Sequence, residues 1–265
     1  MVAKREVAVA GNSTALATID DAEDFAAFGN LGYEHVTSAD LLIPRLTILQ
    51  KMSPQIDESN SAFIEGAKYG DFCDTGTGEI WKTISVVPVY MARIFLEWAP
   101  RSSKKGLVAN HGMDASVLAQ CTMDERRRHI MPNGNYIAET MQWFVLNLSA
   151  NGRKSFIPMT STQLKHSRGW LTKIQSEKIQ RGDGTFFTPA PFYREWIATT
   201  KEESNNDGSW KSWSFAPGRR ITEIDPTKQL LNAAKEFAEQ ARDGLAKGDL
   251  SSGVEEHAAE TNDRM

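Results

Sequence analysis

Aromatic side chains recur beside cationic side chains along this chain, and the pairing is the clearest chemical signal in the sequence. Single-stranded nucleic acid uses both components, because unpaired bases stack on aromatic rings and Lys or Arg neutralises the phosphates. The pattern predicts a group of nucleic-acid-binding residues: Arg93, Phe95, Trp98, Arg153, Lys154, Lys165, Arg168, Trp170, Tyr193, Arg194, Trp196, Trp210 and Lys211.

Two of these pairs have the spacing of neighbours on one face of a strand. Residues two apart in a β-strand point to the same side of the sheet. Arg93 and Phe95 are therefore expected to form one exposed platform for a base and its phosphate, and so are Arg194 and Trp196.

Burial is the alternative for each aromatic ring. The sequence holds seven tryptophans, and a β-rich domain usually places several of them in its core. Trp143 lies in an apolar run and is expected in the core. Trp210 and Trp213 cannot both face one side of a regular strand, so at least one of them is expected to be buried.

Catalytic and metal-binding motifs are absent from the sequence. It contains no GxxxxGKS/T phosphate loop, no HExxH zinc motif and no GxSxG nucleophile motif. Cys73 and Cys121 lie 48 positions apart without a CxxC motif, so neither a disulfide framework nor a zinc site is expected. We therefore expect a protein that is not an enzyme and that needs no cofactor and no metal.

Charge is distributed unevenly along the chain. The formal net charge is −4, but residues 1–36 carry two cations and six carboxylates, and residues 247–265 carry two cations and five carboxylates. These ends have net charges of −4 and −3, which leaves +3 for residues 37–246. Neither end has enough large apolar side chains to offset the entropy of ordering. The sequence predicts a single cationic domain over 37–246 between two acidic, disordered ends.

Strand signals dominate the central domain. The longest strand is expected over 84–98, where β-branched and aromatic residues prevail. Its even-numbered positions are almost all apolar, so they are expected to share one face in the core, while the other face turns polar towards the end of the strand. Three hairpins are expected, over 66–81, 141–159 and 191–215, with Gly, Asn or Asp at their turns. Without an alternation of strands and helices, these hairpins favour an α+β fold or a small barrel.

Helices are expected at three places. Apolar spacings of three and four residues predict helices over 161–180 and 226–247, and the segment 116–130 could form a third. No apolar run approaches the ~20 residues that span a bilayer. The beginning of the chain lacks the apolar core of a secretory signal, so we expect a soluble, cytoplasmic protein without membrane contact.

Five ordered blocks together span about residues 43–215, and they are IPRLTILQKMSPQ, GAKYGDFCDTGTGEIW, VPVYMARIFLEWAPR, STQLKHSRGW and ESNNDGSWKSW. This series of blocks resembles a family of bacteriophage single-stranded DNA-binding proteins. The resemblance implies an oligonucleotide-binding (OB) barrel that acts in phage DNA replication and recombination. It also implies an acidic C-terminal tail that recruits replication or recombination proteins, although this tail ends in Arg264 and Met265 instead of an aromatic residue.

Pattern and resemblance together predict a β-rich α+β fold, which is an OB-like β-barrel with inserted hairpins, one internal helix and a C-terminal helix. The expected partner is single-stranded DNA, bound largely without sequence preference, and homo-oligomerisation stays open. A phage virion structural or assembly protein is one alternative, which would share the β-rich body but lack affinity for oligonucleotides. A recombination-associated nuclease is another, and its nearest candidate carboxylates are Asp71, Asp74, Glu79 and Glu97.

Overall fold

A computed structural model of the 265-residue chain describes residues 31–35, 42–103, 105–125, 127–205, 208–246, 248 and 250. The chain divides into two compact units, Met1–Thr37 and Ser38–Met265. In the first unit, residues 31–35 form turns, and the Gly32 N–H donates to the Glu34 carboxylate. The acidic ends expected over 1–36 and 247–265 lie almost entirely outside the described residues.

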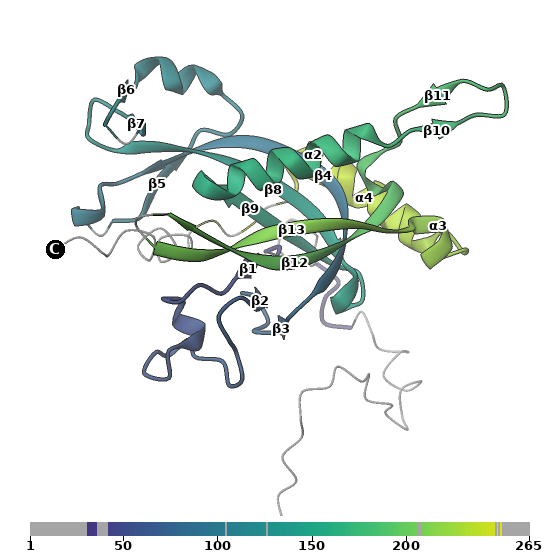
Figure 1. Cartoon of the computed structure of the whole chain (residues 1–265), viewed down its shortest axis with the longest axis horizontal. Helices are drawn as coiled ribbons and strands as arrows, with labels where there is room; N and C mark the ends of the chain where they lie inside the picture. The colour runs from purple at the N-terminus through teal and green to yellow at the C-terminus, as the bar shows by residue number, and fades with distance from the viewer. Residues whose placement is uncertain are drawn as a thin grey trace, which may run out of the picture. The chain divides into compact units, whose positions relative to one another are not determined.

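An antiparallel sheet of eight strands forms the centre of the second unit. The strands follow the order β13-β12-β4-β8-β7-β6, with β5 also paired to β4 and β9 also paired to β8. The long strands curl around the core (Figure 1). The bounds are β4 (Ile84–Trp98), β5 (Leu107–Asn110), β6 (Thr122–Met123), β7 (His129–Ile130), β8 (Tyr136–Asn147), β9 (Arg153–Thr160), β12 (Arg194–Asn205) and β13 (Gly208–Arg220).

A smaller antiparallel sheet links the two sides of this curl. Its strands are β1 (Leu46–Ile48), β2 (Phe72–Asp74) and β3 (Ile80–Trp81). Just before β1, the Pro44 carbonyl accepts the Phe156 N–H of β9 at 3.0 Å. Just after β1, the Gln50 side chain binds the main chain of Lys211 in β13. The two sheets therefore build a β-barrel-like body, and the link to β13 is made by a side chain.

Two helices cover opposite faces of the main sheet. α2 (Leu164–Ser176) packs in the same core as Trp143, whose indole Nε1 donates to the Ser167 hydroxyl at 2.7 Å. α4 (Gln229–Arg242) packs in a second core with the next residue, Phe144. Because neighbouring strand residues point to opposite sides, β8 contributes alternately to both cores.

A bulge in β4 shifts its alternation by one residue. Val89 is an extra residue between the paired positions Pro88 and Tyr90. Proline cannot donate to the ladder, and bulges are a usual place for it within a sheet. Ile84 before the bulge and Met91 after it both pack in the α2 core. The expectation that the even-numbered positions of this strand share one core face is therefore wrong, and both faces of β4 are largely buried.

Most predicted strands are present, and the β-rich α+β class is confirmed. The strand over 84–98 and the hairpins near 66–81, 141–159 and 191–215 all form. The prediction of a helix over 116–130 is wrong. A short 3-10 helix, η3 (Ala115–Gln120), is followed by the hairpin β6–β7. Its turn forms because Arg127 adopts a φ of 59° and the Asp124 carboxylate accepts the Arg128 N–H at 2.8 Å.

The helix expected over 161–180 is shorter in the structure than the apolar spacing predicted. It ends at Ser176, and a hairpin of β10 (Ile179–Gln180) and β11 (Phe186–Phe187) follows. The C-terminal helix expected over 226–247 spans the 14 residues of α4. No helix in the described ranges is both long and apolar enough to cross a membrane. The remaining helices are η1 (Pro54–Ile56), η2 (Arg101–Ser103), η4 (Leu148–Ala150), η5 (Ser161–Gln163), η6 (Pro191–Tyr193) and α3 (Ile221–Ile224).

Candidate nucleic-acid interface

Four aromatic side chains of the predicted binding surface lie in the core. Phe95, Trp98, Trp170 and Trp196 each expose 5% or less of their surface. The segment η3 helps to cover Phe95, and Trp170 of α2 lies edge-on against Trp196 with ring centroids 6.2 Å apart. The expectation that Phe95 and Trp196 form open stacking platforms beside their neighbouring arginines is therefore wrong.

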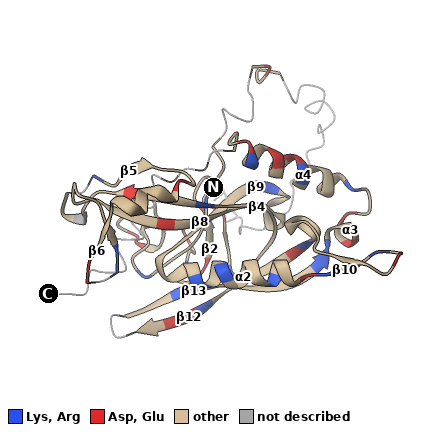
Figure 2. Ribbon diagram, turned by 90° about the horizontal axis from the view of Figure 1, so that it is seen from above, with Lys and Arg blue, Asp and Glu red and all other residues tan. Residues whose placement is uncertain are grey.

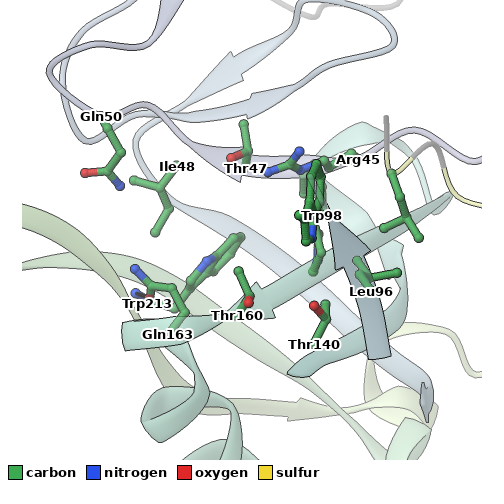
Figure 3. Close-up of a pocket in the computed structure, with 13 residues that line it drawn as sticks. Arg45, Thr47, Ile48, Gln50, Leu96, Trp98, Thr140, Thr160, Gln163 and Trp213 are labelled. Carbon is green, nitrogen blue, oxygen red and sulfur yellow. Dashed lines mark hydrogen bonds between the residues drawn. The ribbon is translucent and has the colours of Figure 1, made fainter. Parts of the chain in front are cut away.

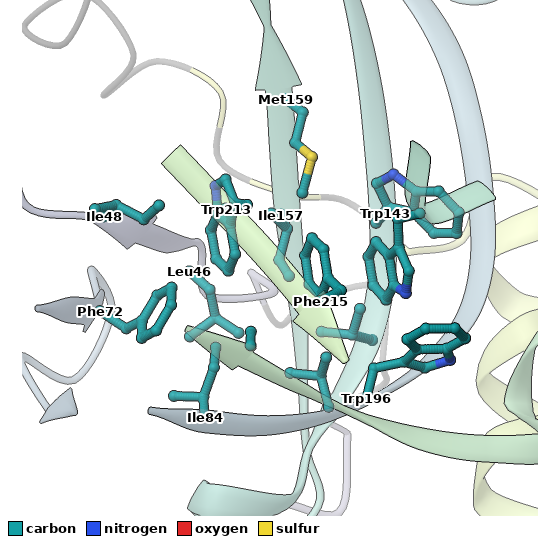
Figure 4. Packing of buried hydrophobic residues seen from close by; sticks show 14 of the residues in the cluster. Leu46, Ile48, Phe72, Ile84, Trp143, Ile157, Met159, Trp196, Trp213 and Phe215 are labelled. Atoms are coloured by element: carbon teal, nitrogen blue, oxygen red, sulfur yellow. The ribbon is translucent and has the colours of Figure 1, made fainter. Parts of the chain in front are cut away.

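Figure 4 shows how the aromatic residues gather in the core beneath α2, where Trp143, Trp196, Trp213 and Phe215 approach one another. Trp143 and Trp213 are 1% and 4% exposed, whereas Trp210 is partly exposed. The predictions that Trp143 is buried, and that at least one of Trp210 and Trp213 is buried, are confirmed.

Two of the predicted cations meet at one carboxylate. Glu139 of β8 lies beside Arg93 of β4 and Arg168 of α2, and its Oε1 is 3.0 Å from Arg93 Nε and 3.0 Å from Arg168 Nη2. The two arginine side chains are 52% and 60% exposed, while Glu139 is 21% exposed. Glu139 thus holds two guanidinium groups at the surface and neutralises the charge of only one.

A second carboxylate binds several cations near Lys165, which lies one helical turn before Arg168 on α2. Glu203 of β12 lies 3.0 Å from Lys165 Nζ, 3.0 Å from His166 Nε2 and 3.3 Å from Lys201 Nζ, and it accepts the Ser212 hydroxyl at 2.8 Å. Burial alone would raise the pKa of Glu203, but the hydrogen bonds of these four side chains lower it to about 2. Burial also lowers the pKa of His166, against the opposing effect of Glu203. Glu203 is therefore ionised at neutral pH and fixes the first turn of α2 to β12.

Together these groups form one surface feature, which we call the α2 cation cluster. Four cations surround two carboxylates, so the cluster has a net charge of +2 when His166 is neutral. Figure 2 shows the Lys and Arg positions along α2. Exposed cations attract polyanions when they outnumber the carboxylates that hold them. Because they are already held in place, they require little rearrangement to bind phosphate. The members are Arg93, Lys165, Arg168, Lys201, Glu139 and Glu203.

Two other predicted cations hold elements of the fold together. Arg153 of β9 binds both Asp74 of β2, at 3.1 Å, and Glu79, which precedes β3. Lys154 Nζ donates to Gln240 Oε1 of α4 at 3.0 Å. These contacts join the small sheet and the C-terminal helix to β9, so neither residue belongs to the α2 cation cluster.

Tyr193 and Arg194 lie at the start of β12. Arg194 Nε is 3.2 Å from the Glu177 carboxylate, just beyond the end of α2. The guanidinium groups of Arg194 and Arg220 lie 5.8 and 6.0 Å from the centroid of the Tyr193 ring. The ion pair of Arg194 with Glu177 anchors the start of β12 to the end of α2.

Lys211 belongs to another group that the sequence did not predict. The ammonium groups of Lys211 and Lys51 lie 5.0 and 5.6 Å from the centroid of the Tyr69 ring, and Lys211 also binds Glu202 at 3.0 Å. Burial and the nearby Glu202 carboxylate raise the pKa of Tyr69. The contact depends on the segment between β1 and β2 folding onto β13, for which the sequence has no local signal.

The carboxylates considered for nuclease activity each have structural partners within the protein. Asp71 accepts a backbone N–H at 3.0 Å, Asp74 and Glu79 share Arg153, and Glu97 binds two asparagines and one histidine. The asparagine hydrogen bonds lower the pKa of Glu97. Throughout the described residues, no group of three or more His, Cys, Asp or Glu side chains could hold a metal ion.

A pocket of about 70 Å³ lies between β1 and the main sheet and is partly open to solvent. Its wall combines the indoles of Trp98 and Trp213 with the Arg45 guanidinium and the hydroxyls of Thr140 and Thr160 (Figure 3). Trp98 therefore lines an internal pocket and does not contribute an outward-facing ring.

These features define a β-rich protein with a barrel-like body, a largely buried set of aromatic rings and a cationic helix face. Residues 11–247 match the family of Pam3 phage gp34-like proteins, and the chain belongs to this family of phage proteins. The phage origin expected from the sequence is thereby confirmed. No curated protein and no solved structure gives a significant match to the chain.

Proposed function

We propose that this phage protein binds single-stranded DNA during DNA replication or recombination, without covalent chemistry and largely without sequence preference. The α2 cation cluster is the observation that carries the proposal. It sets four exposed cations around two carboxylates that bind Lys165 and Arg168, three residues apart on α2, and three of those cations, Arg93, Lys165 and Arg168, come from the group predicted from sequence.

Phosphate contacts supply most of the affinity in this proposal. Glu139 and Glu203 hold the cations in position before DNA arrives, so little side-chain entropy is lost on binding. A phosphate can then share each exposed cation with its carboxylate and release condensed counterions. Because Phe95, Trp170 and Trp196 are buried, base stacking contributes less than the sequence suggested.

An OB-like barrel is part of the same proposal. A curled antiparallel sheet joined through β1 supports it, as does the resemblance of the blocks within residues 43–215 to phage single-stranded DNA-binding proteins. OB folds accommodate about 4–16 nucleotides. A helix with the 13 residues of α2 is about 20 Å long, which is compatible with a footprint in the lower part of that range.

A titration of a fluorescent dT oligonucleotide at about 50 and 200 mM salt tests the proposal. We expect saturable binding at the lower salt and much weaker binding at the higher salt. An absence of binding at the lower salt would refute the proposed function. Removal of residues 251–265 from the acidic tail would separately test whether the tail recruits replication or recombination proteins.

An assembly role is the second candidate, and exposed apolar side chains in one segment favour it. Val108, Met113 and Met123 are 50%, 66% and 64% exposed and lie between the start of β5 and the end of β6. Exposed apolar patches often mark protein–protein contacts. Stable oligomers that show no affinity for the oligonucleotide would support the assembly role over DNA binding.

A further inference from the structure

The hairpin β10–β11 extends from the end of α2 away from the main sheet (Figure 1). Its strands pair Ile179 with Phe187 and Gln180 with Phe186. An isolated two-stranded ribbon is marginal in water, so this hairpin depends on local contacts to keep its shape. The two faces of the hairpin carry different side chains, and these side chains indicate which kind of ligand it can bind.

Phe186 is 65% exposed, although it is a large aromatic residue. In the described part of the second unit, the next most exposed aromatic side chain is Phe63, at 38%. A single exposed apolar side chain is common and needs no explanation by itself. The side chains beside Phe186 on the hairpin indicate whether its ring belongs to a binding surface.

Polar and cationic groups share the face that Phe186 occupies. The strand register places Gln180 opposite Phe186, and Lys178 opposite Thr188 on the same face. The Lys178 ammonium donates to the Thr188 hydroxyl, which agrees with this placement. An open ring, an amide and an ammonium therefore lie together on one side of the ribbon.

The opposite face is arranged differently. The Arg181 guanidinium lies over the Phe187 ring, 4.8 Å from its centroid, and partly covers it. Among the described residues, no cation lies over the Phe186 ring as Arg181 lies over Phe187. One of the two adjacent phenyl rings is thus covered by a cation, and the other is open to solvent.

The turn of the hairpin is held by its own hydrogen bonds. The Asp183 carboxylate accepts the Thr185 N–H at 2.9 Å and its hydroxyl at 2.7 Å, and the Arg181 N–H donates to the Thr185 carbonyl at 2.8 Å. Glu177, at the base of the hairpin, binds Arg194. Both carboxylates of this segment therefore have partners within the protein, whereas the Phe186 ring is largely exposed.

We propose that Phe186 stacks on an unpaired base of single-stranded DNA while Lys178 contacts a neighbouring phosphate. This inference rests on the proposed function and extends its binding surface from α2 onto the hairpin. An apolar protein partner would gain from Phe186 but not from the adjacent ammonium and amide, so the face fits nucleic acid better. Stacking on a flat ring is compatible with any base and adds no sequence preference.

Substitution of the ring tests the proposal, with the full chain and a short fluorescent dT oligonucleotide. Phe186→Ala should weaken binding about 5- to 150-fold, the range found for loss of one stacked base. The dependence of affinity on salt should stay the same, because no charge is removed. Phe186→Tyr should bind like the original protein, since it restores an aromatic face.

Two comparisons complete the test. Phe63→Ala removes an exposed ring far away in sequence and should leave the affinity unchanged. Lys178→Ala should reduce the magnitude of the salt slope by about 0.7, the value for one phosphate contact with a single strand. Thermal unfolding of each variant should match the original protein, because Phe63, Lys178 and Phe186 are all exposed.

The outcomes separate this inference from the proposed function. If Phe186→Ala keeps full affinity while substitutions in the α2 cation cluster weaken binding, the hairpin proposal is overturned and DNA binding stands. If Phe186→Ala changes the oligomeric mass without changing the affinity, the face binds a second copy of the chain, which also overturns the proposal. If the unsubstituted protein fails to bind at low salt, both proposals fall together.

Discussion

The side-chain amide of Gln50 forms two hydrogen bonds with the main chain of Lys211, in the way that a neighbouring strand would. Gln50 Nε2 donates to the Lys211 carbonyl at 2.9 Å, and the Lys211 N–H donates to Gln50 Oε1 at 3.0 Å. Gln163 Nε2 also approaches the Lys211 carbonyl, at 3.3 Å. β13 is the last strand in the sheet order, and these amides occupy part of its outer edge, which otherwise could pair with another chain.

Loss of the Gln50 amide should therefore weaken the fold. We expect Gln50→Ala to lower the free energy of unfolding by about 1–3 kcal/mol, because partly buried main-chain groups of β13 lose their partner. Urea unfolding measures this change. Gln175→Ala, at an exposed position of α2, is the matched control and should shift the midpoint much less. Equal midpoints for both variants would show that the amide link contributes nothing.

The α2 cation cluster should set the salt dependence of DNA binding. Arg93→Gln combined with Arg168→Gln is expected to reduce the magnitude of the slope of log affinity against log salt by up to about 1.4, corresponding to two phosphate contacts. Lys235→Gln combined with Lys228→Gln removes the same charge from exposed positions in and before α4. A similar change in the slope for both pairs would indicate general attraction by net charge and not a defined surface.

Glu139 should restrain the two arginines that it holds. Glu139→Gln removes the negative charge but keeps the shape, so Arg93 and Arg168 become fully available to phosphate. We expect tighter binding of the dT oligonucleotide, by up to about fivefold, since surface ion pairs are worth about 0–1 kcal/mol. Glu239→Gln, on the exposed side of α4, controls for the change in net charge. Weaker binding by Glu139→Gln would mean that positioning of the arginines outweighs their neutralisation.

Glu203 should make stability depend on acid pH. Its pKa is about 2 in the folded protein against 4.5 for an unperturbed glutamate, so its ionised form favours the folded state. This contribution is present above about pH 4.5 and is lost as the pH falls toward 2. We expect Glu203→Gln to reduce the loss of unfolding free energy between pH 6 and about 3, relative to Glu239→Gln, when both are measured by urea unfolding. Parallel pH profiles would contradict this role.

Trp170 should affect stability and not stacking. Its ring lies 3.8 Å from the Phe215 ring and is 1% exposed, so Trp170→Ala should cost about 3–5 kcal/mol of unfolding free energy, as large core truncations do. The milder Trp170→Phe should remain folded and bind DNA with the original affinity. A folded Trp170→Phe variant with strongly reduced affinity would show instead that this indole reaches a base.

Local signals in the sequence were sufficient for most of the strands. The run of β-branched residues in β4 and the turn residues of the three hairpins act over a few neighbours, so they are visible without tertiary information. The exposure of the aromatic rings was not predictable in this way. Two helices cover opposite faces of one sheet, and the bulge at Val89 shifts the alternation of β4, so an alternating pattern could not identify an open face.

The candidate site was predictable only in part. Arg93, Lys165 and Arg168 were identified as cations, but their meeting depends on Glu139 and Glu203, which lie on other strands. The hairpin after α2 had a usable signal in Gly182, Asp183 and Gly184, which favour a turn. Its strands are only two residues long each, so the spacing of the preceding helix was extended to residue 180 in the prediction from sequence.

The bulge determines which face of the sheet each side chain of β4 occupies. Val89 is the one residue between Pro88 and Tyr90 without a counterpart in β8, so its deletion would leave the side chains before and after it on their present faces, with the loss of one buried valine. Deletion of one residue further along, at Arg93, would instead invert Ile94 and every later residue of the strand relative to the two cores. Tolerance of a missing residue is therefore expected to differ sharply between positions only four apart in the same strand.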